Sequence, residues 1–219
     1  MTILKTLTVR LDALGGAVSP ETRGVFDRAI SYTDGIAAQK RDIEAPGTLS
    51  PKGVTQALRD HLSRGLVGEI ERHRKAVVAE AEAISQARKN LGRPKIDPSD
   101  LVGELRRQEI RRWFRDLDPL KRTPAIVERD PTVFEAVITA PAYLSGMKQD
   151  RLEQAAGFYV AQKMPEQVAA LDAREEANMI AGMAVEEAIK TLRKEAGVTA
   201  SELSGWLDNP TVAPGVASE

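Results

Sequence analysis

Apolar residues recur along most of this sequence at spacings of three, four and seven, which places them on one face of an α-helix. At five positions a residue that commonly caps helices is followed directly by proline: Ser19-Pro20, Ser50-Pro51, Asp97-Pro98, Asp118-Pro119 and Asp130-Pro131. Proline at the first helical position loses no hydrogen bond, because that N–H has no partner within the helix. Thr199 and Glu202 add a capping-box pattern. The sequence therefore predicts an all-α protein with several short, proline-capped helices.

The stretch from about 51 to 90 predicts one long helix. Its apolar positions step by four at first and then by seven, through Ile70, Val77 and Ile84. A step of seven keeps side chains on one line of the helix, whereas a step of four drifts around it. Gly65 and Gly68 lie within the stretch. Because a glycine costs about 1 kcal/mol relative to alanine in a helix, we expect a bend or a close contact there.

The stretch from about 165 to 196 predicts a second long helix with small side chains mostly four residues apart. The alanines of this candidate packing seam are Ala173, Ala177, Ala181, Ala184 and Ala188. Small side chains let helix axes approach closely, but alanine is also the best helix former, so both interpretations stay open. We expect these alanines, together with the apolar line of the first long helix, to form narrow seams in an elongated multi-helix assembly.

The first segment, residues 2–14, fits two patterns. Its leucines have helical spacing, whereas Ile3, Leu7, Val9 and Leu11 nearly alternate as in a strand. Gly15-Gly16 is a natural helix stop, which favours a helix, with a short strand as the alternative. Further along, we expect N-terminal helices over 1–92, a C-terminal helical bundle over 93–207, and a flexible tail or docking strap at 208–219.

Composition narrows the class of protein. The chain has no cysteine, which excludes disulfides, thiolate metal ligands and cysteine nucleophiles. Its longest apolar runs are too short to cross a bilayer, and charged residues interrupt the first twenty positions, so neither a membrane partner nor a signal peptide is expected. Only 4% of residues are aromatic while 29% are charged. These values favour an elongated helical protein over a compact enzyme, and the absence of cysteine and of a signal peptide predicts a cytoplasmic location.

Residues that commonly carry catalysis are sparse and poorly placed. His61 and His73 are twelve residues apart, so on one helix they would lie about 18 Å apart and could not share a metal ion. No Walker A, GxGxxG, EF-hand or HExxH motif is present. Neighbouring carboxylates such as Glu175 and Glu176 point about 100° apart on a helix and do not converge. We therefore expect no enzymatic activity, no cofactor and no metal.

Charge is unevenly distributed. Residues 88–122 carry eleven Lys/Arg and six Asp/Glu, whereas residues 166–219 carry four and ten. Five arginines lie within ten residues: Arg106, Arg107, Arg111, Arg112 and Arg115. Three of them, at 107, 111 and 115, repeat every four residues and predict one basic stripe. The apolar residues Leu105, Ile110, Trp113 and Leu117 are expected to face the other way.

Three interpretations of the basic stripe remain open. Pairing with carboxylates of this chain or of another subunit is favoured, because Glu104, Glu109, Asp116 and the acidic last helix are available. A solvated basic face is the second. The third is contact with nucleic-acid phosphates, for which several guanidinium groups on one side of a helix are well suited.

The stretches LGGAVSPETRGVFDRAISYTDGI (14–36) and ITAPAYLSGMKQDRLEQAAGFYVAQKMPEQVAALDAREEA (138–177) resemble helical proteins encoded in the structural gene regions of tailed phages and prophages. The resemblance covers under half of the chain and transfers no catalytic or binding residue. It implies a role in virion structure or assembly, and a location in the virion or the host cytoplasm.

The resulting hypothesis is a head–tail adaptor, scaffold or minor capsid component that contacts other copies of itself or other virion proteins. On this hypothesis the long helices with small apolar edges reach full burial only against other chains. A nucleic-acid-binding helical module that uses the Arg106–Arg115 stripe is the alternative.

Overall fold

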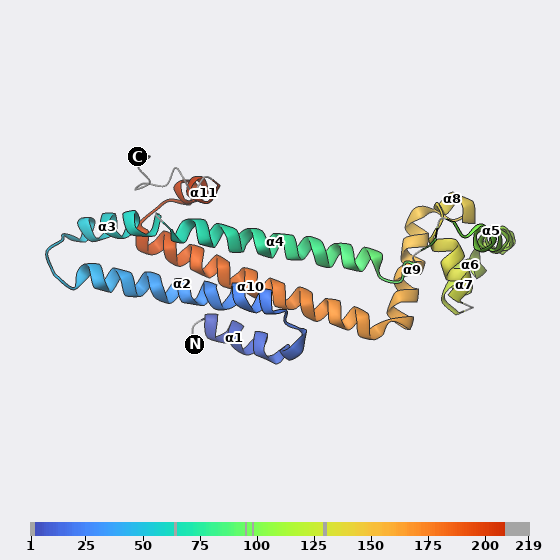
Figure 1. The fold of residues 1–219 in the computed structure, drawn as a ribbon, viewed down its shortest axis with the longest axis horizontal. Coiled ribbons are helices and arrows are strands. Elements are labelled where there is room, and N and C mark those ends of the chain that lie inside the picture. Colours follow the sequence, from blue (N-terminus) through green and yellow to red (C-terminus); the bar gives the residue numbers. More distant parts are fainter. Residues whose placement is uncertain (1–2, 64, 95, 98, 129–130, 209–219) are drawn as a thin grey trace. The chain divides into compact units, whose positions relative to one another are not determined.

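The computed structural model describes residues 3–63, 65–94, 96–97, 99–128 and 131–208. Within these residues every regular element is a helix, which confirms the all-α prediction (Figure 1). The N-terminal segment forms α1 (Ile3–Ala13), so the helical interpretation is correct there and the strand alternative is wrong. The tail predicted at 208–219 lies outside the described residues from 209 onwards.

The chain folds into two compact units, which divide it differently from the predicted boundary between 92 and 93. Unit 1 comprises residues 1–84 and 173–219, and unit 2 comprises residues 85–172. The difference arises because α10 (Pro165–Ala196) buries its C-terminal part in a core that it shares with α2 and α4. Helical periodicity reports the length and the apolar face of a helix, but it does not report which helices share a core.

Unit 1 combines helices from both ends of the chain. Besides α1 and α10, it contains the 3₁₀ helix η1 (Gly15–Ala17), α2 (Pro20–Glu44), α3 (Pro51–Ser63), most of α4 (Leu66–Asn90) and α11 (Ala200–Asp208). Within this unit α2, α4 and α10 run side by side (Figure 1). The predicted continuous helix over 51–90 is wrong, because α3 ends at Ser63 and α4 begins at Leu66. Gly65 lies between them, at the position where a bend was expected.

Helix starts in unit 1 follow the predicted capping chemistry. The hydroxyl of Ser19 accepts a hydrogen bond from the Thr22 N–H at 3.1 Å. At the start of α11 the Glu202 carboxylate accepts from the Thr199 N–H at 2.8 Å, and the Thr199 hydroxyl accepts from the Glu202 N–H at 3.2 Å. These bonds satisfy backbone donors that have no partner inside the helix.

The alanine seam of α10 is buried inside unit 1. Four of its alanines are at most 1% exposed: Ala177, Ala181, Ala184 and Ala188. Ala173, one turn earlier, is half-buried. The seam therefore brings helices of the same chain together, and the expectation that it reaches full burial only against another chain does not hold.

The first part of the apolar line of α4 reaches the same interior. Ile70 is fully buried in the core of unit 1, and Val77 packs against that core. Ile84, at the last position of this part of the unit, is 3% exposed. Asn178 of α10 donates a hydrogen bond to the Val77 carbonyl at 3.0 Å, which ties α10 to α4.

Unit 2 is a group of short helices around a small aromatic core. It contains α5 (Leu101–Asp116), α6 (Pro119–Glu128), α7 (Pro131–Ile138), α8 (Ala142–Ser145) and α9 (Gln149–Lys163). Phe134 stacks on Tyr159 with ring centroids 3.7 Å apart, and Phe114 is fully buried beside them. Gly92 has φ +73°, and a Cβ there would lie 2.7 Å from Val160. Glycine is required at this turn because the chain passes directly over α9.

Enlarging a fully buried alanine of the seam should destabilise unit 1. We expect Ala184→Leu to lower the free energy of unfolding of unit 1 by about 1–3 kcal/mol, because the helices must separate to accept the larger side chain. Denaturant unfolding followed by Trp206 fluorescence, in a Trp113→Phe background, measures this. Ala83→Leu, at an exposed position of α4, is the matched control. Equal stability of the two variants would contradict the tight seam.

Candidate functional site

The arginine cluster of α5 does not form the exposed stripe that its spacing predicts. Arg107 and Arg111 are 8% and 5% exposed and lie on the side of α5 that faces α7. Arg106, Arg112 and Arg115 are exposed. The carboxylate-pairing interpretation therefore holds for two of the five arginines, within this chain.

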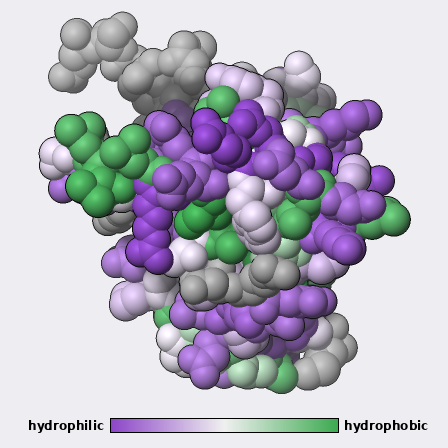
Figure 2. All heavy atoms as spheres, turned by 90° about the vertical axis from the view of Figure 1, so that its right-hand side faces the viewer, coloured by the Kyte–Doolittle hydropathy of each residue, from purple (hydrophilic) through white to green (hydrophobic). Residues whose placement is uncertain are grey.

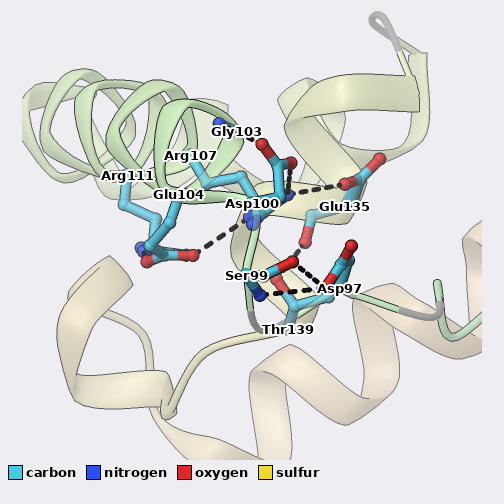
Figure 3. Close-up of polar contacts among 9 residues, drawn as sticks. All are labelled: Asp97, Ser99, Asp100, Gly103, Glu104, Arg107, Arg111, Glu135 and Thr139. Carbon is cyan, nitrogen blue, oxygen red and sulfur yellow. Dashed lines mark hydrogen bonds and ion pairs between the residues drawn. The ribbon is translucent and has the colours of Figure 1, made fainter.

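Arg107 is surrounded by carboxylates from two helices. Its Nε donates to Glu104 at 3.0 Å and its Nη1 to Glu135 of α7 at 3.4 Å. Asp100, which caps α5 by accepting from the Gly103 N–H, lies 3.8 Å from the same Nη1. Figure 3 shows these groups gathered between α5 and α7. A buried guanidinium group with several charged partners is stable only in this arrangement, since losing them would leave an uncompensated buried charge.

Arg111 joins the two helices through a backbone group. Its Nη1 donates to the carbonyl oxygen of Ala136 at 2.9 Å, in the last turn of α7, and its Nη2 pairs with Glu104. The last carbonyls of a helix have no partner within it, so this bond satisfies one of them. Glu104 thus binds both buried arginines, and the ion-pair cluster fixes the rotation of α5 about its own axis.

The cluster shifts the pKa values of its members. The hydrogen bond from Arg107, assisted by Arg111, holds the pKa of Glu104 below its ordinary value of 4.5. The hydrogen bond to Glu104 in turn raises the pKa of Arg107. Both groups stay charged throughout the physiological range, so the cluster is a structural ion-pair network rather than a proton donor or acceptor.

With the arginines turned inward, apolar residues cover part of the outer face of α5. Leu101, Val102 and Leu105 are 74%, 79% and 62% exposed, and we call them the outer triplet. Trp113, which was expected to be an inward residue, is 37% exposed. At about 100° per residue these four positions fall within an arc of about 120°. Of the predicted inward face, Ile110 and Leu117 are half-buried and pack against the core of unit 2.

The three exposed arginines do not share one side of α5. Arg112 and Arg115 are about 60° apart around the helix, but Arg106 and Arg115 are about 180° apart. A row of phosphates would therefore not meet all three at once. The basic surface available to nucleic acid is smaller than the sequence predicts.

The sequence analysis did not single out Arg122, which joins the C-terminal ends of α5 and α8. It donates to the carbonyl oxygens of Leu117 at 3.2 Å, Gly146 at 2.6 Å and Arg115 at 2.7 Å. These acceptors belong to the C-terminal ends of α5 and α8. An isolated arginine in a short helix gives no signal of this role, because its partners are backbone groups.

A second polar group lies in unit 1. The Tyr32 hydroxyl donates to Glu69 at 2.9 Å and lies 3.0 Å from Nε2 of His73. Burial, followed by Glu69, raises the pKa of Tyr32 to about 12, and burial lowers the pKa of His73. His61 is exposed on α3, a different helix from the one that carries His73. Among the described residues no group of histidine and carboxylate side chains is arranged to hold a metal ion.

Comparisons with protein-family models, with characterised proteins and with solved structures gave no match. In the described part of the chain, no helix has both the length and the apolar composition needed to cross a membrane.

Removing Arg111 should destabilise unit 2 far more than removing an exposed arginine of the same helix. We expect Arg111→Ala to lower the free energy of unfolding by about 1–3 kcal/mol, because the Ala136 carbonyl and Glu104 lose a partner. Arg112→Ala should stay within about 0.5 kcal/mol of the parent. Denaturant unfolding followed by Trp113 fluorescence, in a Trp206→Phe background, measures both. Similar decreases in the free energy of unfolding of the two variants would show that the contacts of Arg111 with Glu104 and Ala136 do not stabilise unit 2.

The ion-pair cluster should also make unit 2 sensitive to acid. Because the pKa of Glu104 is lowered in the folded state, its contribution to stability is complete above pH 4.5 and is lost as pH falls through the folded-state pKa. We expect Glu104→Gln to melt at a lower temperature than the parent near neutral pH. That difference should shrink as pH falls to about 3. A difference in melting temperature that does not change with pH would contradict the role of this carboxylate.

Proposed function

We propose that the protein is a non-enzymatic structural or assembly protein of a tailed-phage particle that acts through helix-mediated contacts with other protein chains. The single observation that carries the proposal is the outer triplet of α5. A helix that buries two arginines while exposing two leucines and a valine has its apolar surface on the side that faces solvent. Exposed apolar surface of this kind is typical of protein–protein contact sites.

Other exposed apolar side chains of unit 2 support the same proposal. Leu120 is 86% exposed, Tyr143 74% and Phe158 55%. Figure 2 shows hydrophobic residues at the surface among hydrophilic ones. Phe158 also lines an open groove of about 520 Å³ between α6 and α9, together with Pro124, Val127 and Ala161.

Within this class, the resemblance of residues 14–36 and 138–177 to helical proteins of phage structural gene regions favours a virion role. A head–tail adaptor, a scaffold or a minor capsid component each works by repeated protein contacts and needs no catalytic group. The partners would be other copies of this chain or other virion proteins, and the location would be the virion or the host cytoplasm. The nucleic-acid-binding alternative loses the support of Arg107 and Arg111, which are bound to carboxylates.

Removing the outer triplet should weaken assembly without unfolding the protein. We expect the variant Leu101→Ser, Val102→Ser, Leu105→Ser to bind its protein partners at least about tenfold more weakly, because buried anchor residues dominate interface energies. Light scattering of the full chain, alone and mixed with the products of neighbouring genes, measures the association. Circular dichroism checks that helicity is retained.

A matched control removes three exposed apolar residues from unit 1. Val9, Val78 and Met179 are 62%, 55% and 50% exposed, and replacing all three by serine should leave association unchanged. A parent protein that is strictly monomeric at every salt concentration, both alone and with the products of neighbouring genes, would overturn the proposed function.

A further inference from the structure

A basic pocket lies in unit 2 between the start of α6, the end of α8 and the start of α9, and we call it the cation pocket. It has a volume of about 390 Å³, which is within the range of small-ligand sites, about 300–1,000 Å³. Three cations line it: Arg122 of α6, Lys148 at the N-cap of α9 and Arg151 in the first turn of α9. Among the described residues that line the pocket, none is an aspartate or a glutamate.

The guanidinium group of Arg122 has no countercharge. Its three hydrogen bonds go to the carbonyl oxygens of Leu117, Gly146 and Arg115, which are neutral. Because an arginine has five N–H donors, two remain after these bonds, one on Nη1 and one on Nη2. In the described part of the chain no carboxylate pairs with this half-buried group, whereas Arg107 of α5 is paired with Glu104. An anion from solution would supply the missing negative charge.

The loop after α8 fixes the position of this guanidinium group. Gly146 has φ +68°, which glycine adopts without strain. A Cβ at this position would lie 3.3 Å from Nη1 of Arg122, and the Gly146 carbonyl oxygen accepts from the same Nη1 at 2.6 Å. A donor that is already held in place loses little conformational entropy when a ligand binds to it.

The beginning of α9 adds positive charge to the same pocket. The N-cap residue Lys148 makes no side-chain hydrogen bond to the first turn, and the N–H groups of residues 149–151 have no acceptor among the described residues. Unpaired N–H groups at the start of a helix, together with the helix dipole, favour anions. Lys148 and Arg151 are exposed, and Arg151 donates to Gln154 at 3.2 Å. Both side chains therefore keep donors for a ligand.

The carboxylates that are close in sequence do not neutralise the cation pocket. Asp118 accepts from the Leu120 N–H at 2.8 Å at the start of α6. Asp116 and Asp150 are exposed. Of the residues that the structure describes, these three aspartates neither line the pocket nor form an ion pair with one of its cations. The lining residues thus carry three positive charges and no negative one.

The donors suit a phosphate group better than a carboxylate. A carboxylate offers two oxygens in one plane, whereas the oxygens of a phosphate point in tetrahedral directions and can accept from several sides at once. Here the donors come from a guanidinium group of α6 and from two cations and free N–H groups at the start of α9. Arginine, lysine and a helix N-terminus are the groups that commonly bind phosphate in proteins.

We propose that the cation pocket binds a phosphate group, which either the backbone of a nucleic acid or a free phosphate ion can supply. This site differs from the arginine stripe predicted in α5, of which only the main-chain carbonyl of Arg115 takes part, as an acceptor for Arg122. The inference goes beyond the proposed function, and the pocket shares no residue with the outer triplet. Each of the two can therefore fail without the other.

The test removes the two exposed cations and leaves Arg122 in place. We expect the full chain to bind labelled duplex DNA of two unrelated sequences with the same affinity, because phosphate contacts carry no sequence information. The variant Lys148→Gln, Arg151→Gln should bind about tenfold more weakly at about 0.1 M salt. The slope of log affinity against log salt should fall by about one. Fluorescence anisotropy measures the affinities, and an unchanged melting temperature shows that the fold is retained.

The matched control removes the same charges from another part of unit 2. Arg112 and Lys163 are exposed and do not line the cation pocket. The variant Arg112→Gln, Lys163→Gln should bind DNA within about twofold of the parent, because it has the same net charge as the test variant but an intact pocket.

A second measurement identifies the source of the phosphate. Melting temperatures of the parent are compared in inorganic phosphate and in acetate at equal pH and ionic strength. A ligand that binds only the folded state raises the melting temperature, so phosphate should stabilise the parent more than acetate does. The variant Lys148→Gln, Arg151→Gln should lose this difference, and the control variant should keep it.

Weaker DNA binding by the test variant alone assigns the phosphate to a nucleic acid. Stabilisation by inorganic phosphate without DNA binding, lost in the test variant alone, assigns it to a free ion. Equal effects in the test and control variants would overturn the proposal, because they would show general attraction to positive charge. A parent that binds no DNA and melts at the same temperature in phosphate and in acetate would also overturn it.

Discussion

The orientation of α5 depends on the ion-pair cluster that it forms with α7. Arg107 and Arg111 are removed from water, and a guanidinium group in that position must be matched by carboxylates and carbonyl oxygens. Glu104, Glu135 and the carbonyl of Ala136 provide the match only when α5 has one particular rotation about its axis. With this rotation the outer triplet lies on the side of α5 opposite Arg107 and Arg111, which is exposed. A polar interaction inside unit 2 therefore determines which apolar residues of α5 are exposed.

The two units use apolar residues in different ways. In unit 1 the small side chains of α10 pack against α2 and α4, so helices of the same chain already bury this seam. In unit 2 the core is small, and large apolar side chains such as Leu101, Leu120 and Phe158 remain exposed. The proposed contacts with other chains therefore rest on the exposed apolar residues of unit 2 and not on the alanine seam.

Local features of the fold were predictable because their causes are local. The caps at Ser19 and Thr199 involve residues three positions apart, and the apolar periodicity of α10 lies within one helix. The faces of α5 were not predictable, since arginines repeating every four residues resemble a solvated stripe unless Glu135, 28 residues after Arg107, is known to lie beside them. The two units differ from the predicted division for a similar reason, because an alanine seam has the same pattern whether its partner helix is in this chain or another.

The discontinuity of unit 1 has a consequence for the order of folding. Unit 2 is one continuous segment of 88 residues, from Ser85 to Asp172, so all of its core is available before the rest of α10 leaves the ribosome. Until the C-terminal part of α10 has been synthesised, the core of unit 1 is incomplete, and the apolar faces of α2 and α4 remain exposed. Early formation of unit 2 brings its two ends to a fixed separation and so removes much of the chain entropy otherwise lost when α10 returns to α2 and α4. A folded unit 2 thus lowers the entropy cost of folding unit 1, because it holds the two segments of unit 1 at a fixed separation.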